Sequence, residues 1–420
     1  MALSRNQSSS ALGSGRPGPA MLTVAAILIA TSALGAPSAD RPQPDPSFTA
    51  QLLDGQTSRG RLVSLGPGVI TLASEEGARH EFPLGKIFKL TREASGSVAA
   101  VDRSMVVLPE GDRLTRVTLG AANETALELR SDSLGKLSLP LESILGWIMV
   151  EPSVRDDIDV IWDRVRKEPR KEEVVWLSNG DRLTGSFLGF DRTLKLLTLG
   201  KPRDIEQARI VAVGFDPAHL NYPRPASGYL EFTLSDGTRF GALDARIDDA
   251  TIEANARFGA KARFPLSELI AVHVITPSYV YLTERTPVHA GYSPYVGPTR
   301  EFRADRTVDG HLFSLAGQTF DRGLGTQSRT LLAYRIEPGD RRFQALLGVD
   351  ERAGPSGSVV FRVLVDKVER FKSQPLSHRD APQAVDVDLA GGKFLILDTD
   401  FGARGNIRDF ANWVEARLVR

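Results

Sequence analysis

Apolar and polar residues follow the same order four times between residues 47 and 276. In each copy an apolar strand ends at an acidic or amide residue plus glycine, a second strand follows, and a third strand has alternating Ile, Leu or Thr. The turn pairs are Asp54-Gly55, Glu110-Gly111, Asn179-Gly180 and Asp236-Gly237. Such pairs favour tight hairpins, because glycine readily takes the positive φ that these turns need. The pattern therefore predicts four similar all-β units.

Each unit ends on a second shared signal. Pro83-Leu84, Pro140-Leu141 and Pro265-Leu266 precede Ile87, Ile144 and Leu269, whereas the third copy has Glu206-Gln207 before Ile210. A unit of roughly 45 residues with four or five short strands is a small bent barrel, similar to SH3-like or Sm-like barrels. One such barrel buries little surface, so packing several copies together gives a physical reason for the repetition.

The copies are expected as two neighbouring pairs along the chain, at 47–150 and 173–276, with a helical linker at 151–172. In that linker Ile158, Ile161, Trp162 and Val165 recur at helical spacing, and Pro169 stops the run. The repeat pattern ends near residue 286. Between residues 286 and 420, strands separated by Gly, Pro or Asp predict an antiparallel β-sandwich.

The N-terminus is typical of an export signal. A polar start with Arg5 and Arg16 precedes the apolar run from Met21 to Ala36. This run suits a signal peptide at 1–36, followed by a linker at 37–46, and it is short for a spanning helix. The alternatives are an uncleaved anchor and a start at Met21. With cleavage, the protein is secreted or periplasmic and keeps no integral membrane segment.

Composition excludes several classes of function. The formal net charge is zero, so no basic field favours nucleic acid. The absence of cysteine excludes disulfides and thiolate metal sites. No HExxH, GxSxG or P-loop motif occurs, so we expect no enzyme activity and no required cofactor.

Four segments of the C-terminal third resemble the NPCBM family of carbohydrate-binding modules: "FDRGLGTQS", "FQALLGVDE", "GSVVFRVLVD" and "AVDVDLAGGKFLILDTDFGARGNIRDFANWVEARL". The resemblance extends from near Gly291 to Arg420. It implies a galactose-binding-like jelly roll that binds sugar at loops on one edge and is not itself catalytic. The expected fold class is thus all-β: tandem small β-barrel repeats, one short linker helix and a C-terminal jelly-roll β-sandwich.

Sugar sites combine planar polar side chains, which bind neighbouring hydroxyls, with an aromatic platform. The candidates for carbohydrate binding are Gln327, Asp350, Glu351, Asp400, Asn412 and Trp413, with Tyr295 as an alternative platform. Trp413 also suits a core position, and Asp350 and Asp400 also suit turn caps. A structural calcium ion would take oxygen ligands, for which Asp305, Asp309 and Glu415 are the candidates.

The stretch GLGTQS, Gly323 to Ser328, stops short of a phosphate-binding GxGxxG motif and precedes a strand. We expect Gly323, Gly325 and Thr326 to shape this loop, so that Gln327 meets a ligand. The favoured hypothesis is an exported, non-catalytic protein that binds galactose-type glycans or envelope polysaccharide. The alternatives are a structural or protein-interaction module of the cell envelope and a hydrolase with an unrecognised site.

Overall fold

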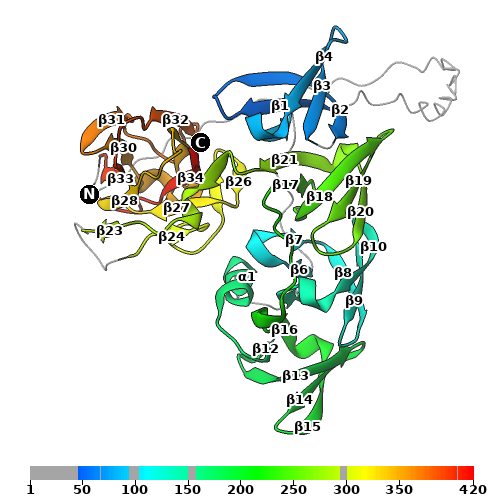
Figure 1. Cartoon of the computed structure of the whole chain (residues 1–420). Helices are drawn as coiled ribbons and strands as arrows, with labels where there is room; N and C mark the ends of the chain where they lie inside the picture. The colour runs from blue at the N-terminus through cyan, green and yellow to red at the C-terminus, as the bar shows by residue number, and fades with distance from the viewer. Residues whose placement is uncertain (1–45, 67, 94–103, 150–157, 294–299, 404) are drawn as a thin grey trace, which may run out of the picture. The chain divides into compact units, whose positions relative to one another are not determined.

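The computed structural model describes residues 46–420, apart from residues 67, 94–103, 150–157, 294–299 and 404 (Figure 1). The expected signal peptide and nearly all of the linker after it lie outside the described residues. Within the described ranges, no helix is both long and apolar enough to cross a membrane.

The four sequence copies form four groups of short antiparallel strands. The first holds β1 (Ser47–Leu52), β2 (Thr57–Gly66), β3 (Val69–Ala73), β4 (Arg79–Pro83) and β5 (Ile87–Arg92). The second holds β6 (Met105–Val107), β7 (Arg113–Leu114), β8 (Val117–Ala122), β9 (Ala126–Ser131), β10 (Gly135–Pro140) and β11 (Gly146–Ile148). The third holds β12 (Glu173–Leu177), β13 (Arg182–Phe190), β14 (Thr193–Thr198), β15 (Lys201–Glu206) and β16 (Ile210–Gly214), and the fourth holds β17 (Tyr229–Leu234), β18 (Arg239–Asp248), β19 (Thr251–Ala256), β20 (Lys261–Pro265) and β21 (Leu269–Ile275).

Within a copy, the last strand pairs with the first, which gives the order β5-β1-β2-β3-β4 in the first copy. The third and fourth copies have the same order. No ladder joins the two end strands of the first copy in the part of the chain that the structure describes, so the likeness to an SH3-like barrel remains an expectation.

The turn glycines adopt one conformation in all four copies. Gly55, Gly111, Gly180 and Gly237 each have φ 89°. In the first copy the Leu52 N–H bonds to the Gln56 carbonyl at 2.8 Å, and Leu177 and Leu234 make the equivalent bond in the third and fourth copies. In the first, third and fourth copies glycine alone has a positive φ, as the Asp-Gly and Asn-Gly pairs predict, whereas in the second copy Glu110 also has a positive φ, 58°.

A single 3₁₀ turn precedes the last strand of every copy: η1 (Leu84–Lys86), η3 (Leu141–Ser143), η4 (Gln207–Arg209) and η6 (Leu266–Glu268). The turn forms in the third copy although Pro-Leu is absent there. The formation of this 3₁₀ turn therefore depends more on its place before the last strand than on the Pro-Leu dipeptide.

Ladders between copies join the first copy to the fourth and the second to the third. β5 pairs with β21, with Leu90 opposite Val272 at the centre, and β11 pairs with β16, with Trp147 opposite Val213. Each of these residues lies three positions after the Ile or Leu that begins the final segment of its copy. The spacing along the chain groups the first copy with the second and the third with the fourth. The ladders instead join the first copy to the fourth and the second to the third.

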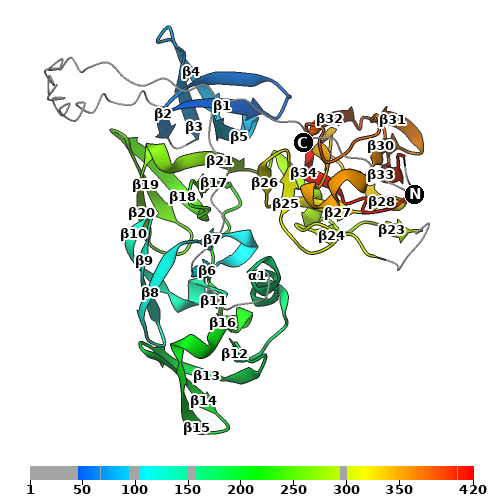
Figure 2. The same cartoon turned by 180° about the vertical axis from the view of Figure 1, so that it is seen from behind.

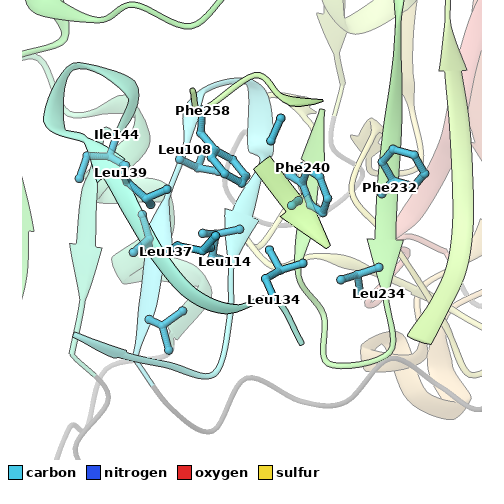
Figure 3. Close-up of a cluster of buried hydrophobic side chains, with 14 of the residues drawn as sticks. Leu108, Leu114, Leu134, Leu137, Leu139, Ile144, Phe232, Leu234, Phe240 and Phe258 are labelled. Atoms are coloured by element: carbon cyan, nitrogen blue, oxygen red, sulfur yellow. The ribbon is translucent and has the colours of Figure 1, made fainter. Parts of the chain in front are cut away.

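One hydrophobic core runs through all four copies. Figure 3 shows Phe258 of the fourth copy beside Leu108 of the second, with Phe240 and Ile144 on either side of them, and all four are fully buried. Burying a side chain of this size contributes about 1.5–3 kcal/mol. A copy alone would leave such side chains in water, which is the physical reason for packing four together.

The expected linker helix is α1 (Ile158–Lys167), which buries Ile161, Trp162 and Val165. It packs beside β6, β11 and β16, as Figures 1 and 2 both show. The helix thus covers the ladder that joins the second and third copies.

The C-terminal region is a sandwich of two antiparallel sheets, which confirms the all-β expectation. One sheet has the order β24-β27-β34-β29-β32, with β22 also paired to β34, and the other has the order β23-β28-β33-β30-β31. The strands are β22 (Tyr279–Tyr281), β23 (His289–Tyr292), β24 (Arg303–Ala304), β25 (Phe313–Leu315), β26 (Gln318–Phe320), β27 (Gly323–Thr326), β28 (Thr330–Arg335), β29 (Arg342–Val349), β30 (Val359–Val365), β31 (Val368–Lys372), β32 (Gln383–Asp388), β33 (Phe394–Phe401) and β34 (Ala411–Val419). Because β22 pairs with β34, the sandwich begins at Tyr279, earlier than the expected residue 286.

Candidate functional site

Four of the predicted sugar-binding residues, Gln327, Asp350, Glu351 and Asn412, lie at one end of the sandwich. Gly325 of β27 and Gly348 of β29 both lie opposite Asn412 of β34. Strands β27 and β29 run in the same direction, so Gln327 and Asp350, which follow them, lie at the same end of the sheet. We call this end of the sheet, with the residues that follow β27 and β29 and those that precede β34, the loop end.

Asp350 and Asn412 form a buried polar pair at the loop end. The Asn412 Nδ2 donates to the Asp350 Oδ2 at 2.9 Å, and the Ser314 N–H donates to the same oxygen at 3.0 Å. Burial raises the pKa of Asp350, against hydrogen bonds that lower it. The Asp350 Oδ1 also caps the 3₁₀ segment η8 (Glu351–Ser356) through the Arg352 N–H. Both side chains are fully buried and hold the loops in place.

Glu351 is exposed and ties a neighbouring hairpin to the loop end. Its Oε2 accepts from the Ser314 hydroxyl at 2.6 Å, and its Oε1 accepts from the Gly317 N–H at 2.5 Å. These hydrogen bonds, with Ser314 the larger cause, lower the pKa of the carboxyl. The β25–β26 hairpin is thereby fixed against the loop that carries Asp350.

Gln327 directly follows the glycine-rich strand β27 at the loop end. It is 8% exposed, and the Tyr292 hydroxyl donates to its Oε1 at 3.0 Å. Its side-chain Nε2 has no hydrogen-bond partner among the described residues, so this amide is held in one orientation with a donor free. A fixed donor of this kind is what recognition of a sugar hydroxyl requires.

The structure also places Asp409 at the loop end, a residue that was not among the candidates for carbohydrate binding. The Asp409 Oδ1 accepts from the Ser358 N–H at 2.9 Å, and its side chain is fully buried. Burial raises its pKa to about 6, against a lowering by hydrogen bonds from the Ser328 side chain and the Ser358 backbone. In the sequence, Asp409 is an acidic residue in a segment that contains glycine and asparagine. Such a segment is equally typical of a solvated turn, so it does not by itself indicate a buried carboxyl.

Trp413 belongs to the core and offers no platform. It is completely buried, its Nε1 donates to the Thr399 hydroxyl at 3.0 Å, and the Phe361 ring packs edge-on at 5.0 Å. The physical reason is its register: Trp413 points between the two sheets, whereas its neighbour Asn412 points to the opposite face. The alternative platform Tyr295 lies outside the described residues.

Asp400 is not brought to the cluster of Asp350 and Asn412. It alternates with the buried Thr399 on β33 and so points out of the sandwich, 3.4 Å from the Arg362 Nη2. Its Oδ1 accepts from the Phe401 N–H at 3.0 Å.

Gly323 and Gly325 lie so close to neighbouring backbone atoms that a larger side chain would not fit. A Cβ on Gly325 would lie 2.1 Å from the Arg306 carbonyl oxygen, and a Cβ on Gly323 would lie 2.6 Å from that of Trp413. The Thr326 hydroxyl donates to the Ala411 carbonyl at 3.1 Å. These contacts hold the backbone of β27 close to the backbone of its neighbours.

The three candidate calcium ligands do not form a common site. Glu415 pairs with Lys89, the Asp305 Oδ1 accepts from the Gly323 N–H at 3.2 Å, and the Asp309 Oδ1 accepts from the Thr307 hydroxyl at 2.5 Å. Within the described ranges, no group of three or more His, Cys, Asp or Glu side chains is placed to hold a metal ion.

Comparison with known families identifies this sandwich. Residues 279–419 match the family profile described as the NPCBM/NEW2 domain. The C-terminal region is an NPCBM domain. The match begins at β22, in agreement with the strand pairing of that segment.

Individual proteins are similar to parts of this chain. A Renibacterium salmoninarum protein provisionally named an endo-alpha-N-acetylgalactosaminidase is 27% identical over 111 residues, which are 26% of this chain and 7% of that protein. The chain thus spans under a tenth of the length of this curated relative.

Among solved structures, CBM51 from Clostridium perfringens GH95 in complex with methyl-galactose is 26% identical, with a TM-score of 0.31, over 33% of this chain and 99% of that one. A CBM51-2 structure in complex with GlcNAc, from Clostridium perfringens ZmpB, is 21% identical, with a TM-score of 0.32, over 43% of this chain and 40% of that one.

Proposed function

We propose that the protein is an exported, non-catalytic carbohydrate-binding protein whose NPCBM domain binds neutral, galactose-type sugars at the loop end. The observation that carries the proposal is the fixed Gln327 amide, with a free donor, beside a buried polar cluster. The family match of residues 279–419 supports a carbohydrate ligand.

The residues of the loop end divide into two roles in this proposal. Gln327 and Glu351 contact the sugar, because the Gln327 Nε2 has no hydrogen-bond partner among the described residues and Glu351 is exposed. Asp350, Asn412 and Asp409 are positioning residues, because they are buried and bonded to the loops themselves. Rigid side chains of this kind limit the entropy lost on binding.

Calorimetric titration of the full chain with methyl-galactose and with N-acetylglucosamine tests the proposal. We expect Gln327→Ala to weaken the binding of the preferred sugar at least tenfold. Gln374→Ala, an exposed glutamine of the same domain, is the control and should bind as the wild type does. Absence of binding by the wild type at millimolar sugar, with and without calcium, would contradict the proposal.

The alternative function is a structural or protein-interaction module of the cell envelope. Retention of the full chain on envelope extract that free sugars do not compete away would favour this alternative. Retention that galactose-type sugars abolish would favour the carbohydrate-binding proposal.

A further inference from the structure

A cavity of about 950 Å³ lies between the NPCBM domain and the repeats. Strands β5, β17 and β21 of the first and fourth copies form one wall, and the β25–β26 hairpin of the NPCBM domain forms another. This volume is at the upper end of the range of about 300–1,000 Å³ that is typical of small-molecule sites.

Ion pairs balance the charges on the walls. Glu231 is 1% exposed and lies 2.7 Å from the Arg239 Nη2 and 2.9 Å from the Arg322 Nη2. The pKa of Glu231 is accordingly held well below its usual range, against the opposing effect of burial. Breaking such a buried pair is costly, so the pairs are a fixed part of the wall.

A second set of pairs continues the wall. The Asp321 carboxylate lies 2.6 Å from the Arg113 Nη1 and 3.2 Å from the Arg239 Nη1. Glu415 lies 2.7 Å from the Lys89 Nζ and 3.2 Å from the His273 Nε2. A strongly charged ligand would have to compete with these partners. A neutral ligand with many hydroxyl groups would instead meet planar, oriented donors and acceptors.

The cavity adjoins the loop end. Ser314, Gly317 and Glu351 line the cavity, and the hydrogen bonds of Glu351 also connect this hairpin to the loop that carries Asp350. Phe320 of the hairpin and Trp162 of α1 line the cavity as well, and both side chains are buried parts of its wall.

We propose that this cavity is an additional carbohydrate subsite, which takes the next units of a neutral oligosaccharide whose terminal sugar is bound at the loop end. The inference rests on the proposed function. It assigns the repeats a role in ligand binding, because Thr233, Lys89 and Ala271 of the cavity wall all come from repeat strands.

Cavity-filling variants of the full chain test the subsite. Thr233 is partly buried on β17 and lines the cavity, so Thr233→Trp should occupy the space for sugar units. Thr193→Trp is the matched control, because Thr193 is also partly buried but lies on β14 of the third copy. Thr319→Trp, on the exposed β26 strand of the hairpin, gives a second filling variant if Thr233→Trp does not fold.

The probes are methyl-galactose, N-acetylglucosamine and neutral oligosaccharides that end in the preferred sugar, titrated by calorimetry. We expect the wild type and Thr193→Trp to bind an oligosaccharide at least tenfold more tightly than the monosaccharide. The filling variants should bind both equally, with monosaccharide affinity unchanged. If the monosaccharide binds but oligosaccharides gain nothing, or if folded filling variants keep that gain, the subsite is wrong and the loop-end proposal stands. If the wild type binds no sugar, both proposals are wrong.

Discussion

Leu90 of β5 lies directly opposite Val272 of β21, and both side chains are fully buried. The two residues hold the same position in the first and fourth copies, so the ladder between those copies is locally two-fold symmetric. Trp147 and Val213 stand in the same relationship between the second and third copies. Equivalent last strands therefore join the copies in two pairs, and the pairing of Arg113 with Arg239 and the shared core join these pairs to each other.

The centre of the second ladder should be a stability hot spot. Trp147 is completely buried and packs against the Phe187 and Phe215 rings at 5.9 and 5.3 Å. We expect Trp147→Ala to lower the free energy of unfolding by about 3–5 kcal/mol, because it leaves a large cavity. Urea denaturation measures this change. Leu199→Ala, at a side chain that is 95% exposed, should change it by under about 0.5 kcal/mol, and equal effects of both would contradict the role of the ladder.

The turn glycines should contribute to stability because they adopt a positive φ that other residues adopt only with strain. Gly180 has φ 89° and no atom within 4 Å of an added Cβ, so Gly180→Ala introduces backbone strain without a clash. We expect a loss of about 1–2 kcal/mol of stability, measured by thermal unfolding. Gly66→Ala is the control, because Gly66 does not have a left-handed φ and its nearest contact is 3.6 Å. That variant should be unchanged or more stable by about 0.4–1 kcal/mol, and a comparable loss in both would refute the explanation.

The pKa of Asp409 predicts a pH-dependent contribution to stability. Its folded pKa is raised to about 6, above an unfolded value of about 4. The folded state therefore binds more protons than the unfolded state between these values, and this contribution to stability falls as pH rises from about 4 to about 6.

Asp409→Asn isolates this effect. The difference in Tm, variant minus wild type, should increase between pH 4 and pH 7, because only the wild type must ionise a buried carboxyl. Asp112, whose pKa burial also raises, is present in both proteins and cancels in the difference. Asp191→Asn, at an exposed carboxyl, is the control for the loss of one negative charge. A Tm difference for Asp409→Asn that does not change with pH would show that Asp409 does not ionise differently on folding.

The buried ion pairs of the cavity should contribute to stability far more than exposed pairs do. Glu231→Gln leaves Arg239 and Arg322 without their shared carboxylate, and we expect a loss of about 3–5 kcal/mol by urea denaturation. Glu253→Gln, which removes the exposed pair with Arg246 in the same copy, should have little effect. A wild-type-like stability for Glu231→Gln would mean that water or other groups replace the carboxylate.

Local patterns determined several features in advance. The Asp-Gly and Asn-Gly pairs specify the positive φ at Gly55, Gly180 and Gly237, because only glycine adopts it without steric cost. The helical spacing of Ile161, Trp162 and Val165 specifies the buried face of α1. The motif GLGTQS and the segments that follow it indicate the NPCBM family, because their order and spacing match that family. The glycines of the motif lie where the backbone of β27 approaches its neighbours closely.

Long-range contacts decided the rest. By itself the sequence determined that the chain is all-β, contains four similar units and ends in an NPCBM domain, because turns, periodicity and motif spacing are local properties. Only the tertiary structure decided that the first copy pairs with the fourth, that Trp413 is core and that Glu415 meets Lys89 instead of joining Asp305 and Asp309 at a metal site. These outcomes depend on which surfaces bury the most apolar area and which charges can be paired once they leave water. Neither quantity is defined until residues far apart in the chain are brought together.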